Sequence, residues 1–264
     1  MVIPSVKKTR VLAIHAHPDD IEFQCAGTLS LLQRAGCQLH LTTMTAGDCG
    51  SADLKPEEIA QIRRDEARQS ASVIDAEYQC LEFMDLSITA DTTSHRRVTE
   101  AIRKTRPDIV LTAPPIDYMS DHEVTSRLVR DACFSASVPN FSTHQWDPCA
   151  PLEHIPHLYY MDPMEGVDWF RNPVEPDFYI NISSTYEQKK QMLACHNSQR
   201  TWLQKQHGID EYLSSMHRWS SQRGKEIRVP FAEAFRQHTG HPYPQDNLLL
   251  ALVCQDGKGK TEQT

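Results

Sequence analysis

The 264-residue sequence lacks the features of several protein classes. It has no apolar run near the 18 residues that a membrane-spanning helix needs, and its longest candidate, 248–253, is far too short. Residues 1–8 include Pro4 and two lysines but no apolar segment, so we expect no secretory signal. Positive charge is not in excess either, since 27 Lys and Arg face 35 Asp and Glu, for a net charge of −8. The counterion release that drives nucleic-acid binding therefore has no evident source, and we expect no nucleic-acid partner.

The eight cysteines form no C-x-x-C pair and no group of close spacings. A chain of this length does not need disulfides to stabilise its core. We therefore expect reduced thiols, several of them packed as small apolar side chains, and a cytoplasmic protein. With 39% hydrophobic and 23% charged residues, the composition is that of a globular protein.

The first half of the chain alternates short apolar runs with longer segments of helical periodicity. Strands are predicted at 10–15, 38–44, 78–83 and 108–112, and helices at 22–35, 56–74, 93–104 and about 121–136. Strands that alternate with helices of this length form β-α-β units. The sequence therefore predicts an α/β fold with a Rossmann-like parallel sheet and helices on both faces.

The second half of the chain is less regular. We expect strands at 157–161 and 178–182, helices at 185–203 and about 209–221, and then an irregular tail. No linker or repeat divides the sequence. It predicts one domain, 1–264, in which 1–147 forms the core and 148–264 a smaller, irregular C-terminal elaboration.

The most informative segment is Ala16-His17-Pro18-Asp19-Asp20, which follows the first predicted strand and precedes a helix. The carboxyl end of a parallel strand is where doubly wound folds bind their ligands. Pro18 stiffens the turn, so that the side chains of His17 and Asp20 can converge on a metal ion while Asp19 points elsewhere. The alternative is that Asp19 or Asp20 only caps the following helix, a role that Asp fills well.

A second polar cluster, Asp121-His122, follows the predicted strand 108–112 and opens another helix. Crossover connections bring the ends of neighbouring parallel strands together, so His122 can reach the same point as His17 and Asp20. Two imidazoles and one carboxylate, with a fourth position open to water, are the composition of a catalytic zinc site. Taken alone, His122 is equally explained as a helix-terminal residue or as a support for a ligand.

These segments resemble the signature of the LmbE/PIG-L family of zinc-dependent N-acetylglucosaminyl deacetylases, most closely the chitobiose and GlcNAc deacetylases. The resemblance begins with the AHPDD segment and Glu22 and continues in order along nearly the whole chain, through 27–29, 45–48, 63–66, 121–122, 138–141, 195–199 and 231–236. It implies one Zn²⁺ per chain held by His17, Asp20 and His122, with Asp19 as general base. It also implies a small amino-sugar or glycoconjugate substrate and a homo-oligomer.

The sequence departs from the family pattern at Met119, where many members have a histidine that stabilises the oxyanion. A methionine side chain cannot donate a hydrogen bond. Tyr118 carries a hydroxyl one position away, although it is equally explained as an aromatic residue packed on the end of the sheet. His196 falls within the apolar stripe of its predicted helix, so it either packs in the core or belongs to the site. We expect His196 to supply the missing oxyanion donor, with Tyr118 as the second candidate.

Two further residues are candidates for binding a sugar. Arg63 lies near the centre of the inward face of its predicted helix, where a guanidinium must be paired. Its partner is either Glu66, one helical turn later, or the hydroxyls of a sugar substrate. Asp85, just beyond the predicted strand 78–83, is placed either to accept a bond from a sugar hydroxyl or to form a turn.

Together these features predict a zinc-dependent hydrolase that removes the N-acetyl group from an N-acetylglucosamine-type sugar or glycoconjugate by means of metal-activated water. Two alternatives remain open at this point. One is an amidase of the same fold that acts on a non-sugar or thiol-conjugate amide. The other is a binder of a metabolite that has lost turnover, which Met119 makes worth testing.

Overall fold

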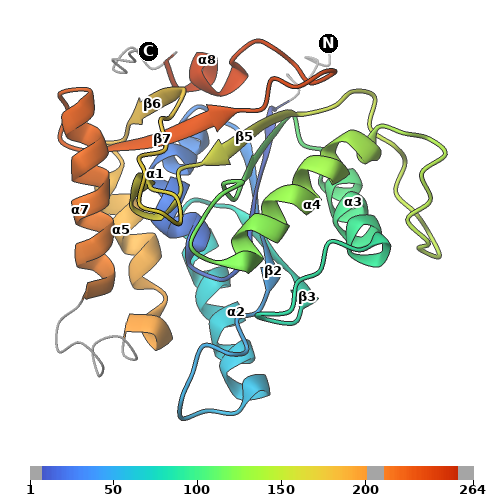
Figure 1. Ribbon diagram of the computed structural model, residues 1–264, viewed down its shortest axis with the longest axis horizontal. Coiled ribbons are helices and arrows are strands. Elements are labelled where there is room, and N and C mark those ends of the chain that lie inside the picture. Colours follow the sequence, from blue (N-terminus) through green and yellow to red (C-terminus); the bar gives the residue numbers. More distant parts are fainter. Residues whose placement is uncertain (1–7, 201–210, 255–264) are drawn as a thin grey trace, which may run out of the picture.

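The computed structural model describes residues 8–200 and 211–254, and in these residues the chain forms a seven-stranded sheet of order β3-β2-β1-β4-β5-β7-β6 (Figure 1). The strands are β1 (Arg10–His15), β2 (Gln38–Thr45), β3 (Glu77–Phe83), β4 (Ile109–Thr112), β5 (His157–Met161), β6 (Phe178–Asn181) and β7 (Ala232–Gln237). β3, β2, β1, β4 and β5 pair in parallel, and β7 is antiparallel to both β5 and β6. The predicted α/β fold is confirmed.

The helices follow the strands as the β-α-β pattern requires. They are α1 (Asp20–Arg34), α2 (Pro56–Ser72), α3 (Thr92–Thr105), α4 (Ser120–Ala136), α5 (Tyr186–Ala194), α7 (Glu211–Glu226) and α8 (Leu248–Cys254), with a 3₁₀ turn, η1, at Met164–Gly166. Local sequence signals determine where two of these helices begin. Pro56 begins α2, and the Asp91 carboxylate caps α3 by accepting the N–H of Ser94 at 2.9 Å. None of the described helices is long and apolar enough to span a membrane.

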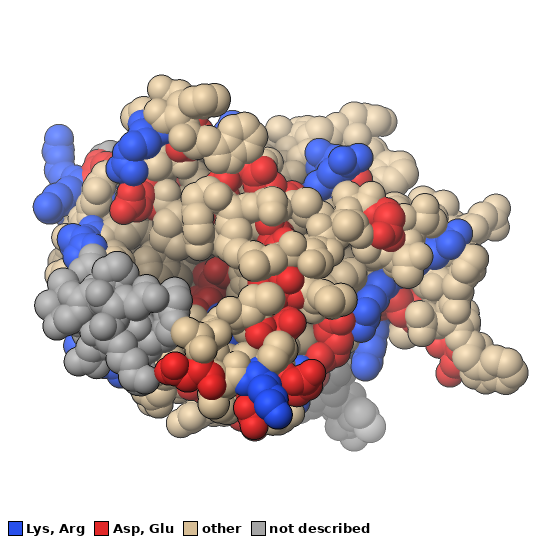
Figure 2. All heavy atoms as spheres, turned by 60° about the horizontal axis from the view of Figure 1, so that its bottom comes forward, with Lys and Arg blue, Asp and Glu red and all other residues tan. Residues whose placement is uncertain are grey.

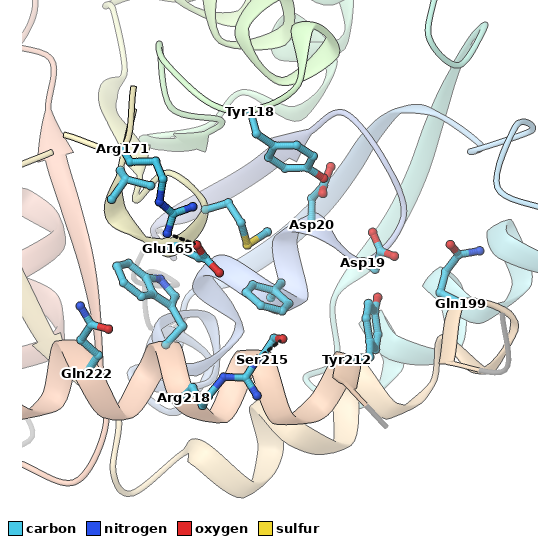
Figure 3. Close-up of a pocket in the computed structure, with 14 residues that line it drawn as sticks. Asp19, Asp20, Tyr118, Glu165, Arg171, Gln199, Tyr212, Ser215, Arg218 and Gln222 are labelled. Carbon is cyan, nitrogen blue, oxygen red and sulfur yellow. Dashed lines mark hydrogen bonds and ion pairs between the residues drawn. The ribbon is translucent and has the colours of Figure 1, made fainter. Parts of the chain in front are cut away.

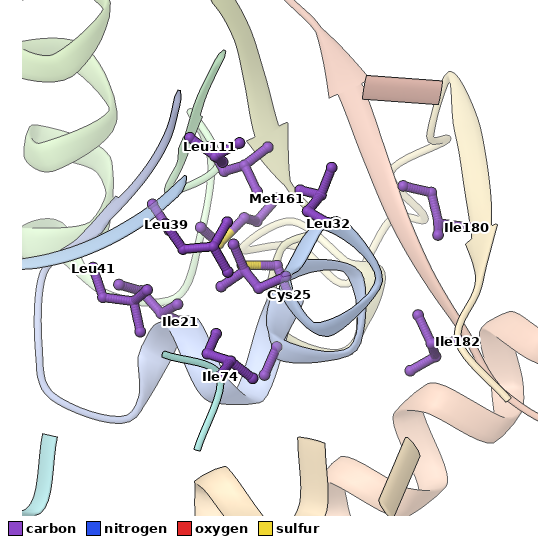
Figure 4. Close-up of a cluster of buried hydrophobic side chains, with 14 of the residues drawn as sticks. Ile21, Cys25, Leu32, Leu39, Leu41, Ile74, Leu111, Met161, Ile180 and Ile182 are labelled. Carbon is purple, nitrogen blue, oxygen red and sulfur yellow. The ribbon is translucent and has the colours of Figure 1, made fainter. Parts of the chain in front are cut away.

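Alternate residues of the central strands bury into two separate apolar layers. On β1, Val11 and Ala13 face the layer that includes α1, α5, α7 and α8, part of which is drawn in Figure 4. Leu12 and Ile14 face the opposite layer, which is covered by α3 and α4. Because both faces of the sheet are buried, its strands read in the sequence as continuous apolar runs.

The prediction of an irregular tail was wrong, because the C-terminal part contributes β7 and α8. Strand β7 was missed since Glu233 interrupts its apolar residues. The carboxylate of Glu233 is buried because it accepts the N–H groups of Gly27 and Thr28, at 2.9 and 2.7 Å, and pairs with Lys189 Nζ at 2.6 Å. These partners lie far away in the sequence, so local periodicity does not reveal that a charged residue is accommodated inside this strand.

The predicted helix 185–203 is broken. Helix α5 ends at Ala194, His196 is not helical, and residues 197–200 are helical again. The Glu66 carboxylate accepts both the N–H and the hydroxyl of Ser198, each at 2.7 Å, which holds the start of the new segment against α2. Residues 201–203 of this prediction, and 209–210 of the next predicted helix, lie outside the described residues.

The candidate residues gather at the carboxyl edge of the parallel strands. From β1 the strand order continues to β2 and β3 on one side and to β4 and β5 on the other. This reversal is the point at which open α/β sheets bind ligands. Figure 2 shows Asp and Glu atoms inside and alongside a hollow of the surface.

Candidate active site

The turn that joins β1 to α1 has an unusual backbone at Asp19. Its φ of 102° is left-handed, a conformation that costs most residues free energy and that Asp tolerates better than most. Asp19 occupies the N-cap position of α1 but makes no side-chain capping bond. Asp20 turns back instead, and its Oδ2 accepts the N–H of His17 at 2.8 Å. The capping alternative therefore does not describe Asp19, and strain of this kind is typical of functional sites.

The structure brings the three predicted metal ligands together around one carboxylate oxygen. Oδ2 of Asp20 lies 3.1 Å from His17 Nδ1 and 3.3 Å from His122 Nε2. Two ligands of one tetrahedral zinc, with bonds of 2.0–2.1 Å, are separated by about 3.3 Å. His15 Nδ1 also lies 2.7 Å from this oxygen, which is a hydrogen-bond distance. Among the described residues, two groups have donor atoms close enough for a metal, namely His15–Asp20–His122 and His17–Asp85–Asp121, so that His17 and His122 fall in different groups.

Carboxylates lie close to the outer nitrogens of both candidate histidine ligands. Asp117 Oδ2 lies 2.8 Å from His122 Nδ1. His17 Nε2 lies 3.0 Å from Asp85 Oδ1 and 3.4 Å from Asp121 Oδ2. The Asp117 contact is a hydrogen bond that fixes the ring orientation and tautomer of His122 and leaves its other nitrogen free to bind a metal. His17 Nε2 and Asp85 Oδ1 are close in space but have no partner in hydrogen-bond geometry within the described residues. Sequence reasoning missed Asp117, and the only signal for it was a carboxylate in the loop between β4 and His122.

The electrostatics of this cluster fit a bound cation. Asp20, Asp85, Asp117 and Asp121 are all buried, and no Lys or Arg among the described residues forms an ion pair with them. Burial lowers the pKa of His122, but the charge of Asp20 and the Asp117 bond outweigh it and raise the pKa to about 9. His122 Nε2 has no hydrogen-bond partner within the part of the chain that the structure describes. A divalent ion at this point would neutralise the buried negative charge, and imidazole and carboxylate ligands suit zinc.

Asp19 is held by Arg63 of α2. Arg63 Nη2 lies 3.3 Å from Asp19 Oδ2 and donates to the carbonyl oxygen of Pro18 at 2.7 Å, while Nη1 donates to that of Gly47 at 3.3 Å. Burial raises the pKa of the Asp19 carboxyl, and the charge of Arg63 opposes this shift. The inward orientation predicted for Arg63 is confirmed, but its ion-pair partner is Asp19, because Glu66 is engaged by Ser198.

A cavity of about 730 Å³ opens beside this cluster (Figure 3). Its described lining consists of Asp19, Asp20, Phe23, Tyr118, Met164, Glu165, Val167, Arg171, Gln199, Tyr212, Ser215, Arg218, Trp219 and Gln222. The ring of Tyr118 meets that of His122 edge to face, with centroids 5.3 Å apart. The described lining therefore combines carboxylates, several aromatic rings and two arginines.

Five predicted site residues do not belong to this lining, and two of them are the candidate metal ligands His17 and His122. Asp85 faces His17, and its Oδ2 accepts the N–H of Cys49 at 3.2 Å. His196 is fully buried, with Nε2 3.0 Å from Glu22 Oε1, and Arg63 lies behind Asp19. Sequence reasoning missed most of the lining, including Tyr212, which lies in the predicted helix at about 209–221 but carried no signal of a site.

Comparison with known proteins identifies relatives of two activities. The chain is 29% identical over 196 residues to the diacetylchitobiose deacetylase of Thermococcus kodakarensis, covering 72% of this chain and 70% of that protein. It is 22% identical over 194 residues to the 4-oxalmesaconate hydratase of Pseudomonas putida, covering 70% of this chain and 71% of that protein.

Solved structures share the fold. An N,N'-diacetylchitobiose deacetylase from Pyrococcus horikoshii matches 89% of this chain and 87% of its own, with a TM-score of 0.76 and 24% identity. The 4-carboxy-2-hydroxymuconate hydratase GalB from Pseudomonas putida matches 91% of this chain and 99% of its own, with a TM-score of 0.74 and 20% identity. Residues 12–133, which include β4 and the candidate ligands His17, Asp20 and His122, match the sequence profile of the GlcNAc-PI de-N-acetylases. This part of the chain is therefore similar to the GlcNAc-PI de-N-acetylase (PIG-L) family.

Proposed function

We propose that this protein is a metal-dependent deacetylase that hydrolyses the N-acetyl group of an amino sugar or glycoconjugate. The observation that carries the proposal is the position of Asp19, a carboxylate on the cavity lining directly beside the His17–Asp20–His122 group. The similarity to the PIG-L family and to a diacetylchitobiose deacetylase supports it. The reaction adds water across the amide C–N bond and yields acetate and a free amine.

One Zn²⁺ per chain would be held by His17 Nδ1, Asp20 Oδ2 and His122 Nε2. When bound, the ion supplies a Lewis acid for the acetyl carbonyl and lowers the pKa of water to about 7. Asp117 holds the His122 imidazole in the tautomer that this role requires, and the Asp85 carboxylate lies 3.0 Å from His17 Nε2. His15 is not assigned to the ion in this proposal; its Nδ1 accepts the N–H of Ala16 at 2.8 Å and lies 2.7 Å from Oδ2.

Asp19 acts as the general base and then as the general acid. Its carboxylate takes a proton from the attacking water and returns it to the nitrogen of the leaving amine. Arg63 favours the ionised carboxylate and so opposes the effect of burial, because a nearby positive charge stabilises the charged form. The raised pKa of this buried carboxyl helps it to hold the proton until the C–N bond breaks.

The cavity is large enough for a glycoconjugate, since small-molecule sites occupy about 300–1,000 Å³. Tyr118 offers a hydroxyl beside His122, and we assign it to the acetyl oxygen. Arg63 and Asp85 act on Asp19 and His17 in this proposal, because neither lies on the lining. Contacts to the rest of the substrate fall to α7, which presents Ser215, Arg218, Trp219 and Gln222.

Hydration of an unsaturated acid is a second candidate, favoured by the match of this chain to 99% of the hydratase GalB. The experiment measures acetate release by the zinc-loaded protein from N,N'-diacetylchitobiose, N-acetylglucosamine and N-acetyl thiol conjugates. In parallel, it follows the ultraviolet absorbance of an unsaturated oxo-tricarboxylate. Acetate release that Asp19→Asn abolishes supports the deacetylase and identifies its amide. Hydration without acetate release would contradict the deacetylase and support the hydratase. A zinc-loaded protein with neither activity would support the remaining alternative, a binder of a metabolite without turnover.

A further inference from the structure

Tyr212 is a polar residue of the cavity that the roles above do not use. It lies in the first turn of α7, and its ring packs against the main apolar core. Figure 3 shows its hydroxyl directed toward the carboxylate of Asp19. The ring is therefore fixed by the core, while its polar end meets the proposed base.

The Tyr212 hydroxyl has no partner in hydrogen-bond geometry within the described residues, although it is buried. A buried hydroxyl without a partner is costly, so it needs an acceptor nearby. The Asp19 carboxylate faces it and can accept from it. Burial and the charge of Asp19 raise the pKa of Tyr212 well above its ordinary value, so that the hydroxyl keeps its proton and can only serve the carboxylate as a donor.

We propose that Tyr212 is a positioning residue, whose hydroxyl donates to Asp19 and, together with Arg63, holds this carboxylate toward the metal-ligand group. This inference rests on the proposed function only in naming Asp19 as the base. Asp19 needs such support because its backbone is left-handed, it makes no capping bond, and its contact with Arg63 is long at 3.3 Å. Since α7 also supplies Ser215 and Trp219 to the cavity, one helix both lines the substrate site and orients the base.

The test is a double-mutant cycle in which acetate release is measured at saturating and at limiting substrate. Tyr212→Phe should lower kcat about tenfold, the loss expected for one hydrogen bond to a charged group, with KM and zinc content unchanged. In an Asp19→Asn background it should cause no further loss. Tyr186→Phe is the matched control, because its hydroxyl is 2.8 Å from His217 Nδ1, away from the cavity, and it should leave kcat unchanged. An equal loss in both backgrounds, or a change in KM alone, would overturn the proposal.

A second double-mutant cycle measures stability and does not depend on catalytic turnover. In urea, Tyr212→Phe should lower the unfolding midpoint of the zinc-loaded wild type, but not that of Asp19→Ala, which has no acceptor at this position. If the wild type releases no acetate from any substrate, the proposed function fails, and this cycle still decides whether Tyr212 acts on Asp19. Midpoint shifts of equal size in both backgrounds would show that the hydroxyl is independent of Asp19.

Discussion

Replacing Asp117 by asparagine changes the hydrogen bond that orients His122 and keeps the shape of the side chain. In the native protein, Asp117 Oδ2 lies 2.8 Å from His122 Nδ1, and Oδ1 accepts the N–H groups of Tyr118 and Met164 at 2.8 and 3.2 Å. The amide oxygen of the introduced asparagine can keep both backbone bonds, which places its NH₂ group opposite Nδ1. Because an NH₂ group only donates, the imidazole proton must move to Nε2, the nitrogen that faces Asp20.

A protonated Nε2 cannot bind a metal, so we expect zinc affinity to fall. Loss of a supporting hydrogen bond to a zinc ligand costs about 10- to 100-fold in affinity, which is about 1.4–2.7 kcal/mol. The metal-free protein should lose less than about 1 kcal/mol of unfolding free energy, since the backbone donors keep their acceptor. Asp117→Ala leaves both donors unpaired and should cost about 1–3 kcal/mol for each.

Zinc affinity is measured by competition with a chromophoric chelator, and stability by urea unfolding of the metal-free protein. Asp131→Asn is the matched control, because Asp131 lies on α4, the helix that carries His122, but its carboxylate pairs with Arg130 away from the cluster. An Asp117→Asn protein that binds zinc within about twofold of wild type would refute the tautomer argument. Equal stability of the Asp117→Asn and Asp117→Ala variants would refute the assignment of the backbone bonds.

Three further predictions concern the base and the metal. Asp19→Asn should retain zinc and lose about 10²- to 10⁴-fold in kcat, checked by metal analysis and acetate release. Gly47→Ala should destabilise the protein, because Gly47 has a φ of +68°, and should also lower kcat, because an added Cβ would collide with the Arg63 guanidinium. Gly36→Ala is the control: Gly36 has a φ of +83° but no atom within 4 Å of an added Cβ, so this variant has the backbone strain alone and should leave kcat unchanged. Removing zinc with a chelator should lower the thermal midpoint, by the equivalent of about 2.7 kcal/mol relative to protein with free zinc at 100 times its Kd; an unchanged midpoint would contradict the metal site.

The sequence predicts the parallel part of the fold well because its strands are buried on both faces. β1 and β5 have the predicted bounds, since each is a short apolar run. Strand β7 could not be predicted in the same way. Its Glu233 is compatible with a buried strand only because Lys189 and the backbone of α1 lie against it, and nothing within β7 indicates those partners.

The candidate site also has a part that the sequence predicts and a part that it does not. Strand order alone predicts that His17, Asp20 and His122 converge, because the ends of neighbouring parallel strands share one edge of the sheet. What orients these side chains depends on packing that the sequence does not express. Asp117 is recognisable only once the loop after β4 is seen to fold back on His122, and Tyr212 reaches Asp19 from a helix nearly two hundred residues away along the chain.

His196 has two possible roles, one catalytic and one structural, and the last prediction distinguishes them. The sequence predicts it as the donor that replaces the histidine absent at Met119, whereas the structure buries it against Glu22 at 3.0 Å and off the cavity lining. Burial lowers the pKa of His196, but the Glu22 carboxylate outweighs this and raises it, so the two form a buried ion pair. We therefore expect His196→Ala to cost about 3–5 kcal/mol of stability, because it leaves a buried charge unpaired.

Replacing both partners distinguishes the two interpretations. A buried ion pair exchanged for apolar side chains of similar volume is often neutral in stability. The double variant Glu22→Met with His196→Leu should therefore recover most of the unfolding free energy that His196→Ala loses, measured by urea unfolding. If the role of His196 is structural, kcat for acetate release recovers with stability. A double variant that is as stable as wild type and retains its KM, yet is slower in kcat by about 10²-fold, would instead identify His196 as an oxyanion donor, because that is the loss expected when such a donor is removed.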